Sequence, residues 1–411
     1  MRASRGLGGR LVREARGRPM AHAVLELIWH SDGITRAGIA RSTGLARSTV
    51  SEIVGDLLET DLVVEAEEAP SGGGRRAVML RFAAAARVVL GLDIGAAHVS
   101  VVLTDMAGNE LFWHDEPFGA QGDPDGTMRL VGRVVTRGLS EVAGDTPLLG
   151  IGVGLPAPID HSTPRAPAAS VLPAWDGHSG LRDLAARLHV PLELENDANL
   201  GALAELWWGS TDGIRDFTFL KVATGVGAGH IVRGEIFGGA SGVAGEIGHV
   251  TIDPEGEMCV CGNRGCLTTL VGTQALLQRA ERGRMCNPDS VLATGELSVE
   301  RLVDAADQGD PLALEIVEEA GTYLGDAIAS LVNLMNPGEV VLGGGLSRAG
   351  DRLLDAVRRV VASRTLVASV LSTQIRASTL GERDVALGAA TLVIAAALER
   401  PDRYFREVAA L

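Results

Sequence analysis

At 411 residues and a net charge of −15, the chain is too long for one ordinary domain and too acidic to bind nucleic acid over its whole surface. Its composition, 46% apolar and only 3% aromatic, is typical of an α/β or helix-rich globular protein and excludes a disordered one. The first 50 residues, however, hold nine arginines against three acids. This basic end predicts a separate DNA-facing module, with residues 1–17 as a disordered basic arm in front of it.

Neither a membrane span nor a secretory signal is predicted. The longest apolar run, Leu387 to Leu398, is too short to cross a bilayer and fits a buried helix. The arginines of residues 1–19 are followed by no apolar core segment. We therefore expect a cytoplasmic protein without a membrane partner, in which the four cysteines are reduced.

Residues 18–84 have the pattern of a winged helix-turn-helix DNA-binding domain. A helix from Met20 to Trp29 is followed by two shorter apolar stripes that the turn residue Gly44 joins. The last helix is expected to enter the major groove by its first turns, which makes its groove-facing side chains Arg47, Ser48, Thr49 and Ser51. The alternative is a plain three-helix packing unit, which would not require the segment that follows.

That segment predicts the wing. Strands from Leu62 to Glu65 and from Val78 to Phe82 flank a glycine-rich tip that ends in Arg75 and Arg76. A flexible, doubly charged tip suits phosphates or a narrow minor groove, although a merely mobile loop is the alternative. The alanines at 83–86 then form a connector, where we place the domain boundary.

Beyond the connector the chain repeats a hairpin pattern. VVLGLDIGAAHVSVVLTD, from Val88, recurs in kind as FTFLKVATGVGAGHIV, from Phe217, and a third glycine turn follows the strand Val340 to Leu342. Three such turns would suit a nucleotide between two lobes, although each glycine can equally serve a tight turn without a ligand. A P-loop is excluded because the only lysine, Lys221, precedes its glycine turn, and a dinucleotide fingerprint fails because His230 stands at the third glycine position.

The segment from His249 to Cys266, HVTIDPEGEMCVCGNRGC, predicts a metal site. One imidazole and three thiolates, from His249, Cys259, Cys261 and Cys266, are a complete tetrahedral set for zinc and leave no position for metal-bound water, so the zinc should be structural. Disulfides are the alternative, which a reducing compartment and an odd cluster of three cysteines disfavour. Glu246 lies three residues before His249, so a metal that fixes the histidine also fixes a carboxylate suited to sugar hydroxyls.

With these motifs in this order, the chain resembles the ROK family of repressors, open reading frames and sugar kinases over about residues 88–400. The motifs are GLPAPID (154–160), ENDAN (195–199), TGVGAG (224–229), GEIGH (245–249) and the histidine–cysteine cluster. The resemblance implies an α/β fold: a winged helix-turn-helix followed by a two-lobed sugar kinase, Hsp70 and actin-like (ribonuclease H-like) body. Its small lobe would span residues 85–198, completed by a helix at about 385–400, and its large lobe with the zinc site residues 199–384.

The resemblance also implies roles for individual residues. Asn196 and Asp197 match the family's sugar-binding pair, and in the kinases this aspartate is the base that takes a proton from the attacked hydroxyl. Glu246 and His249 match its other sugar contacts. For Asp197 the alternative is a polar cap on the predicted helix Leu200 to Trp207. The residues that match the nucleotide loops are Asp93, Gly95, Thr224, Gly225, Gly227 and Gly344.

Three departures separate the chain from the kinase branch. Ala96 and Ala97 replace the second glycine and the threonine of the first phosphate loop, Thr268 replaces a glutamate that touches the sugar, and Ala157 replaces the glycine of Pro-Gly-Pro. Losing one phosphate donor typically costs about 3 kcal/mol of barrier. We therefore expect phosphoryl transfer to suffer more than sugar binding.

Together these patterns predict a sugar-responsive transcriptional regulator, a repressor and not an enzyme. Its expected partners are double-stranded operator DNA, a sugar or sugar derivative, and copies of itself in a homodimer or homotetramer, because paired half-sites need a twofold assembly. The expected cofactor is zinc. One alternative is a sugar kinase that uses ATP, Mg²⁺ and Asp197 as base while retaining its DNA-binding domain. Another is an architectural DNA-binding protein that responds to no ligand.

Overall fold

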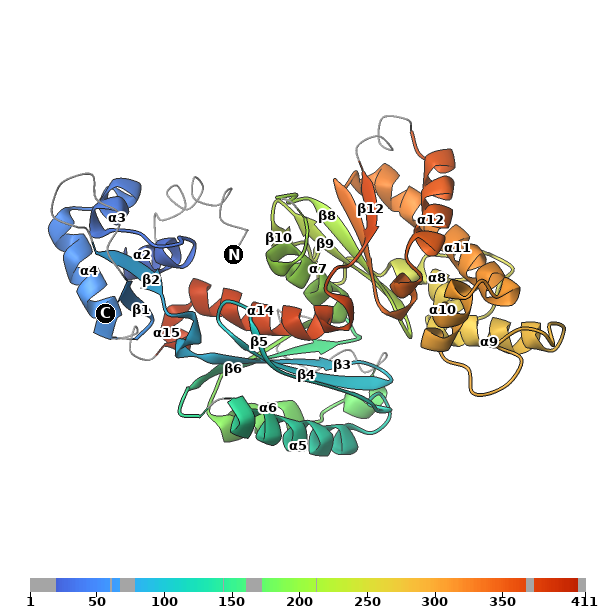
Figure 1. Cartoon of the computed structure of the whole chain (residues 1–411), viewed down its shortest axis with the longest axis horizontal. Helices are drawn as coiled ribbons and strands as arrows, with labels where there is room; N and C mark the ends of the chain where they lie inside the picture. Colours follow the sequence, from blue (N-terminus) through green and yellow to red (C-terminus); the bar gives the residue numbers. More distant parts are fainter. Residues whose placement is uncertain are drawn as a thin grey trace.

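The computed structural model describes residues 20–59, 61–66, 78–142, 144–159, 172–211, 213–366 and 373–405. A small helical module with a two-stranded sheet is followed by two lobes, each built on a five-stranded sheet (Figure 1). Within the described part of the chain, no helix is long and apolar enough to cross a membrane. The basic arm expected at 1–17 and the predicted wing-tip residues Arg75 and Arg76 lie outside the described residues.

The amino-terminal module packs three helices against a short antiparallel hairpin. Thr35 caps the second helix by accepting a hydrogen bond from the Gly38 amide (3.0 Å), and Gly44 ends it in a left-handed conformation (φ 75°). Both strands begin one residue later than predicted. The elements are α2 (Met20–Trp29), α3 (Arg36–Thr43), α4 (Arg47–Glu59), β1 (Val63–Ala66) and β2 (Met79–Phe82).

The small lobe follows a short 3-10 turn, η2 (Ala84–Ala86), and has the strand order β5-β4-β3-β6-β7. β3 pairs antiparallel with β4 and parallel with β6, so the first predicted hairpin forms the centre of this sheet. Its described elements are β3 (Val88–Ile94), β4 (His98–Asp105), β5 (Glu110–Pro117), α5 (Pro124–Val142), β6 (Leu148–Leu155), η3 (Pro173–Trp175), α6 (Gly180–Leu188) and β7 (Leu192–Asn196).

The large lobe has the strand order β10-β9-β8-β11-β12, with the second predicted hairpin as β8 and β9. β8 also pairs in parallel with β11, which brings the third glycine turn beside the second. The described elements are α7 (Asp197–Trp208), β8 (Phe217–Val222), β9 (Val226–Val232), β10 (Glu235–Ile236), η4 (Ile247–His249), α8 (Leu267–Val271), α9 (Thr273–Arg284), α10 (Val299–Asp307), α11 (Pro311–Met335), β11 (Glu339–Gly343), η5 (Gly345–Ala349), α12 (Asp351–Arg364), β12 (Gln374–Ala377) and η6 (Gly381–Arg383).

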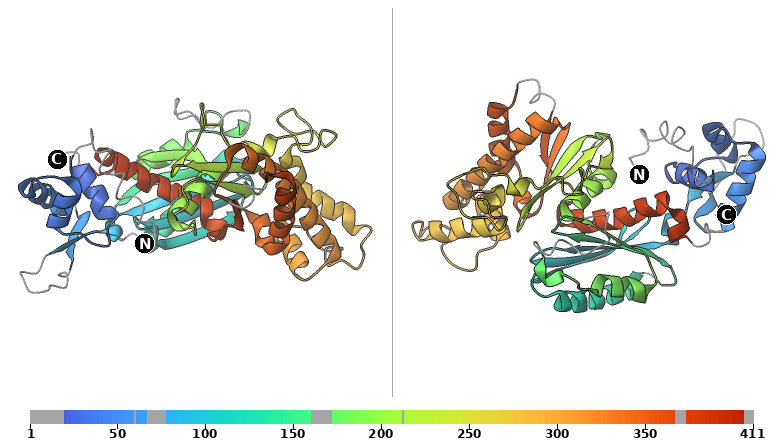
Figure 2. Two further views of the ribbon diagram at one scale, coloured as in Figure 1. Left: turned by 90° about the horizontal axis from the view of Figure 1, so that it is seen from above. Right: turned by 180° about the vertical axis from the view of Figure 1, so that it is seen from behind.

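The carboxyl-terminal helix α14 (Asp384–Glu399) connects all parts of the molecule (Figures 1 and 2). It lies on the face of the small-lobe sheet opposite α5 and α6, where Gly152 permits close packing because an added Cβ would lie 1.9 Å from the Ala389 carbonyl oxygen. It also crosses α7 at Gly388, where a Cβ would lie 2.0 Å from the Leu200 carbonyl oxygen. Val393 of α14, in turn, belongs to the same apolar cluster as the winged-helix core, and α15 (Pro401–Tyr404) follows.

Candidate functional site

The only lysine of the chain lies buried at the junction of the two lobes. Lys221 is on β8, and its Nζ lies 2.9 Å from Asp197 Oδ2 and 3.5 Å from Asp93 Oδ2. Asp93 belongs to β3 of the small lobe, whereas Asp197 is the first residue of α7. The lysine side chain is only 9% exposed. One buried ammonium group therefore joins β8 both to the preceding helix α7 and to β3, which lies far earlier in the sequence.

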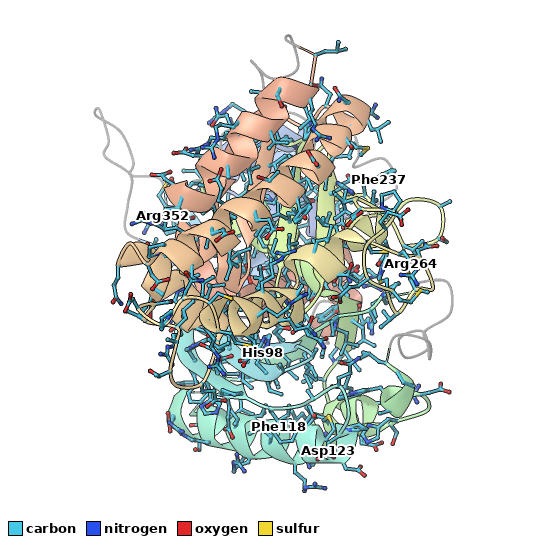
Figure 3. The ribbon with its side chains drawn as sticks, turned by 90° about the vertical axis from the view of Figure 1, so that its right-hand side faces the viewer. His98, Phe118, Asp123, Phe237, Arg264 and Arg352 are labelled. Atoms are coloured by element: carbon cyan, nitrogen blue, oxygen red, sulfur yellow. The ribbon has the colours of Figure 1, made fainter. Side chains whose placement is uncertain are left out.

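Two further titratable side chains complete this cluster. His98, at the start of β4, places Nε2 3.0 Å from Asp93 Oδ2, and Figure 3 shows it near the boundary between the lobes. Asp384, the first residue of α14, lies at the end of β11, because a Cβ on Gly343 would be 2.8 Å from Asp384 Oδ2. Gly343 is the strand partner of Lys221, so the cluster converges at the carboxyl end of β8 and β11.

The electrostatics of the cluster favour ionised Asp93 and Lys221. Burial acts to raise the pKa of Asp93, but Lys221 and His98 together hold that pKa below its usual value. Burial acts to lower the pKa of Lys221, and the carboxylates of Asp197, Asp93 and Asp384 raise it above its usual value instead. Burial raises the pKa of Asp384 to about 7, although Lys221 opposes this shift. His98 has a raised pKa because the attraction of Asp93 outweighs the effect of burial.

The first glycine turn is closed by contacts within the small lobe. The carbonyl oxygen of Ala97 accepts a hydrogen bond from the Phe118 amide (3.0 Å), and that of Ala96 accepts one from the Gln121 amide (3.4 Å). The His98 ring lies over Gly95, where an added Cβ would be 2.3 Å from the ring. The imidazole and the two alanines therefore stand at the turn that the sequence resemblance matches to a first phosphate loop.

The other two glycine turns differ in exposure and packing: the second is open to solvent, whereas the third is packed against β8. Thr224 and Gly225, between β8 and β9, are exposed. Gly344 has φ 84°, and a Cβ there would lie 2.2 Å from the Val222 carbonyl oxygen, so the approach of β8 explains this glycine without a ligand. Thr268 Oγ1 lies beside the turn between β8 and β9, 3.7 Å from the position that a Cβ on Gly225 would take.

Asn196 and Asp197 lie where β7 passes into α7. Asn196 is the helix cap: its Oδ1 accepts hydrogen bonds from the amides of Ala198 (2.9 Å) and Asn199 (3.2 Å). The alternative role predicted for Asp197, that of a cap, therefore falls to its neighbour, and the helix begins three residues before the predicted Leu200. Asn196 Nδ2 also donates to the Ala157 carbonyl oxygen (3.3 Å), which ties the start of α7 to the segment Pro156 to Pro158 that follows β6.

Glu246 and His249 face the same region from the large lobe. His249 Nε2 lies 3.8 Å from Glu246 Oε2, and Asp197 is close enough to Glu246 to act on its charge. Burial raises the pKa of Glu246, with His249 opposing the shift. Both side chains remain partly open, at 44% and 37% exposed. A polar molecule could therefore reach these two groups.

The four predicted metal ligands converge, with all ligand atoms within 4.8 Å of one another. Cys259 Sγ lies 3.5 Å from His249 Nδ1, and Cys261 Sγ lies 3.6 Å from Cys266 Sγ. Tetrahedral zinc, with Zn–S bonds of about 2.3 Å, separates neighbouring sulfurs by about 3.8 Å, so the cluster is close to the required size. His249 uses Nδ1 on this side, which leaves Nε2 toward Glu246.

The chemistry of the donors also fits a cation. Burial raises the pKa of Cys266 to about 12, whereas a hydrogen bond from the Asn263 amide lowers the pKa of Cys261 to about 7. Three adjacent thiolates repel one another unless a cation lies between them. All four cysteines of the chain are free in the described structure, so the disulfide alternative is not observed. The residues present fit a metal.

The predicted DNA-contacting residues occupy the first turns of α4. Arg47, Ser48 and Ser51 are exposed, whereas Thr49 is half-buried between the exposed face and the core. The Ser51 hydroxyl donates to the Arg47 carbonyl oxygen (2.9 Å), so this serine is partly committed to its own helix. Arg47 is the longest of the four side chains and is free to extend from the surface.

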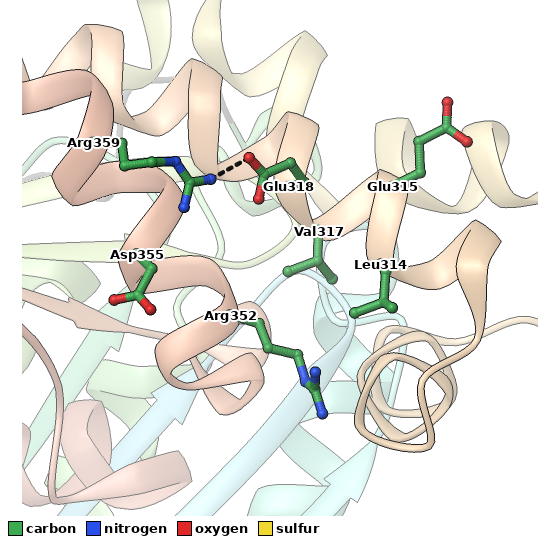
Figure 4. A pocket seen from close by; sticks show the side chains of 7 residues that line it. All are labelled: Leu314, Glu315, Val317, Glu318, Arg352, Asp355 and Arg359. Carbon is green, nitrogen blue, oxygen red and sulfur yellow. Dashed lines mark hydrogen bonds and ion pairs between the residues drawn. The ribbon is translucent and has the colours of Figure 1, made fainter. Parts of the chain in front are cut away.

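A separate surface pocket lies between α11 and α12 (Figure 4). It contains an ion pair between Arg359 and Glu318, but it shares no residue with the lobe junction or the metal cluster. Its lining residues are Leu314, Glu315, Val317, Glu318, Arg352, Asp355 and Arg359.

Proteins of the ROK family are similar to this chain in sequence and in fold. A family model described as the ROK family matches residues 89–396. The chain is 30% identical to the xylose repressor of Caldicellulosiruptor bescii, over 92% of this chain and 96% of the repressor. It is 33% identical to a glucokinase of Halalkalibacterium halodurans, over 75% of this chain and 95% of the kinase. A crystal structure of a ROK family transcriptional regulator, a homologue of Escherichia coli Mlc, has a TM-score of 0.80 at 23% identity, covering 98% of this chain and all of that one. The predicted α/β fold is confirmed.

Proposed function

Because this chain belongs to the ROK family, we propose that it is a sugar-responsive, DNA-binding transcriptional regulator that acts as a repressor. The observation that carries this function is the extent of the match. The relative named a xylose repressor is matched over 92% of this chain, so the match must reach into residues 1–84, whereas the glucokinase matches only 75% of the chain. About a quarter of the chain therefore lies outside the match to that kinase. This share is large enough to include the arm and the winged-helix module, residues 1–84.

The cluster around Lys221 supports a regulator without useful kinase turnover. Asp197 is the residue that a sugar kinase would use as base, but it accepts a hydrogen bond from an ammonium group that carries a raised pKa. Lys221 thus occupies one of the two carboxylate oxygens that a base would have to turn toward the attacked hydroxyl. The first turn also lacks the hydroxyl that would contact phosphate, since Ala97 stands in its place. ATP and Mg²⁺ therefore belong only to the alternative function.

The sugar site that we propose consists of Asn196 and Asp197 from one side and Glu246 and His249 from the other. Carboxylate and amide groups are the usual partners of sugar hydroxyls, and Asp197, next to Asn196 where α7 begins, is close enough to Glu246 to act on its charge. A sugar that contacts both sides would favour a closed arrangement of the lobes. By linkage, DNA that prefers the open arrangement must then weaken sugar binding by the same factor.

The metal that we propose for the cysteine cluster is zinc, held by His249, Cys259, Cys261 and Cys266. Four protein donors and no open position make it a structural ion, and when bound it supplies charge neutralisation to the thiolates. The protein's own part is to hold the His249 ring by Nδ1, so that Nε2 stays directed toward Glu246. The metal would thus order one wall of the sugar site.

For DNA, we propose that α4 reads the major groove and that the protein acts in the cytoplasm as a homodimer or homotetramer on paired half-sites. Arg47→Ala should relax discrimination at one base pair by about 1–3 kcal/mol, because a bidentate contact to guanine is lost. Arg137→Ala is a matched control, since this arginine is 61% exposed on α5 of the small lobe. Equal operator affinity and equal base preference for wild type and Arg47→Ala would contradict the assignment of α4.

The function itself is tested by a thermal-shift screen of sugars, with each active sugar then added to an operator-binding assay. We expect at least one sugar to raise the unfolding temperature and to weaken operator binding, and Asp197→Asn to abolish both effects. The same sugars with ATP and Mg²⁺ test the kinase alternative. Turnover that Asp197→Asn abolishes would overturn the non-enzymatic assignment, and a protein that binds DNA but responds to no sugar would favour the architectural alternative.

A further inference from the structure

The cluster of Lys221, Asp93, Asp197, Asp384 and His98 is largely buried and contains more acidic than basic side chains. Three carboxylates, those of Asp93, Asp197 and Asp384, act on the lysine, and Asp93 and Asp384 are only 3% and 4% exposed. The imidazole of His98 faces Asp93 from β4, with Asp115 acting on that imidazole in turn. Of the 37 basic residues in the chain, Lys221 is the only one with a compact ammonium head.

The oxygen atoms of the cluster are incompletely satisfied. Asp93 Oδ1 and Asp384 Oδ2 are both buried without a hydrogen-bond partner among the described residues. An unpaired buried oxygen normally costs free energy, so a cluster that leaves two of them open is unusual for a purely structural ion pair. A divalent cation, by contrast, takes six or more oxygen ligands from carboxylates and water. The three carboxylates thus offer more oxygen acceptors than the hydrogen bonds of one ammonium group satisfy.

We propose that Lys221 is an internal cation that fills a latent divalent-cation site formed by Asp93, Asp197 and Asp384 at the junction of the lobes. The ammonium group neutralises part of the carboxylate charge and joins β3, β8 and α7 without any metal. It also prevents a hard cation, Mg²⁺ or Mn²⁺, from entering this place. This role of Lys221 does not depend on which sugar the protein binds.

Lys221→Ala tests the proposal, because it removes both the charge and the four side-chain atoms that fill the site. The full-length, zinc-loaded protein is titrated with Mn²⁺, and free Mn²⁺ is followed by electron paramagnetic resonance. We expect one Mn²⁺ per chain in Lys221→Ala, and at least tenfold weaker binding in wild type. Lys221→Arg is the charge-retaining control: because it keeps a positive charge among the carboxylates, it should bind Mn²⁺ at least tenfold more weakly than Lys221→Ala.

A second substitution tests whether Mn²⁺ binds to the carboxylates or to the cysteine cluster. Asp93→Asn in the Lys221→Ala background should weaken Mn²⁺ binding at least tenfold while the zinc content stays at one per chain. Mn²⁺ binding that is insensitive to Asp93→Asn would overturn the proposal. So would a folded Lys221→Ala protein with no Mn²⁺ site at up to about 1 mM, the weak end of protein sites for hard cations.

Lys221→Ala could also fail to fold in metal-free buffer, since three buried carboxylates would then lack a counter-charge. The thermal unfolding transition is therefore recorded with and without Mn²⁺. Recovery of a cooperative transition in Mn²⁺, and not in an equal concentration of a monovalent salt, would support the latent site. A transition that Mn²⁺ leaves unchanged would overturn it.

Discussion

A buried ion network at the far end of α7 offers a direct test of what holds the large lobe together. Arg376, on β12, places Nε 2.6 Å from Glu339 Oε1 and one terminal nitrogen 2.9 Å from Glu205 Oε2. The side chains of Glu205 and Glu339 are 0% and 3% exposed, and the arginine is 20% exposed. Arg376→Met keeps most of the apolar stem and removes only the charged head.

The expected cost follows from the two carboxylates that the substitution leaves behind. Breaking a buried ion pair by removing one partner typically costs about 3–5 kcal/mol, because the remaining charge loses its compensation. Ser378 still donates to Glu205 (2.6 Å), so part of that loss is recovered by one hydrogen bond. We therefore expect about 3 kcal/mol, at the lower end of the range. Neutralising both acids as Glu205→Gln and Glu339→Gln in the same protein should recover much of it.

Native-state hydrogen exchange of the β11 and β12 amides measures this change locally. About 3 kcal/mol corresponds to exchange that is at least about a hundredfold faster through opening of the lobe. Arg137→Met is the control, because its pair with Glu141 is 61% and 48% exposed and should contribute less than about 1 kcal/mol. If Arg376→Met accelerates exchange no more than this control does, the network does not stabilise the lobe as argued.

Two further changes test the metal cluster and the acid sensitivity of the fold. Cys261→Ser removes one of four donors, so metal content measured by mass spectrometry should fall well below one per chain and the sugar response should weaken; a variant that keeps both would contradict the account. Burial lowers the pKa of His230 from 6.5, so the unfolded chain binds the proton more readily and stability falls as the pH drops below that value. His230→Asn should reduce the fall in unfolding temperature between about pH 7 and about pH 5, and an unchanged slope would argue against it.

Much of the fold could be predicted because its determinants are local. The first helix of the winged module, Met20 to Trp29, was predicted with the bounds that the structure shows, since its apolar stripe repeats at helical spacing. The two strands of the hairpin begin one residue later than predicted, because apolar Leu62 and Val78 extend the sequence pattern beyond the residues that pair. The start of α7 was missed by three residues because Asn196, expected as a sugar contact, also has the geometry of a cap.

The candidate site could be predicted only where its residues lie close together in the sequence. The four donors of the metal cluster fall within 18 positions, so their spacing already indicated one site. Lys221 excludes a P-loop by its position, and the fact that it is the sole lysine is the one sign in the sequence of its special environment. His98 and Asp384 gave no sign at all, because their roles depend on strand pairing and on the return of the last helix to the lobe junction.

The path of α14 has a geometrical consequence for the DNA-binding end. The helix begins with Asp384 beside the lysine and continues to the winged-helix core, a distance of about 24 Å for its 16 residues at 1.5 Å each. A tilt of about 10° at the first end moves the other by about 4 Å, which exceeds the rise of one base pair, about 3.4 Å. A small angle set at the lobe junction is thus enough to displace the winged-helix module by more than one base-pair step.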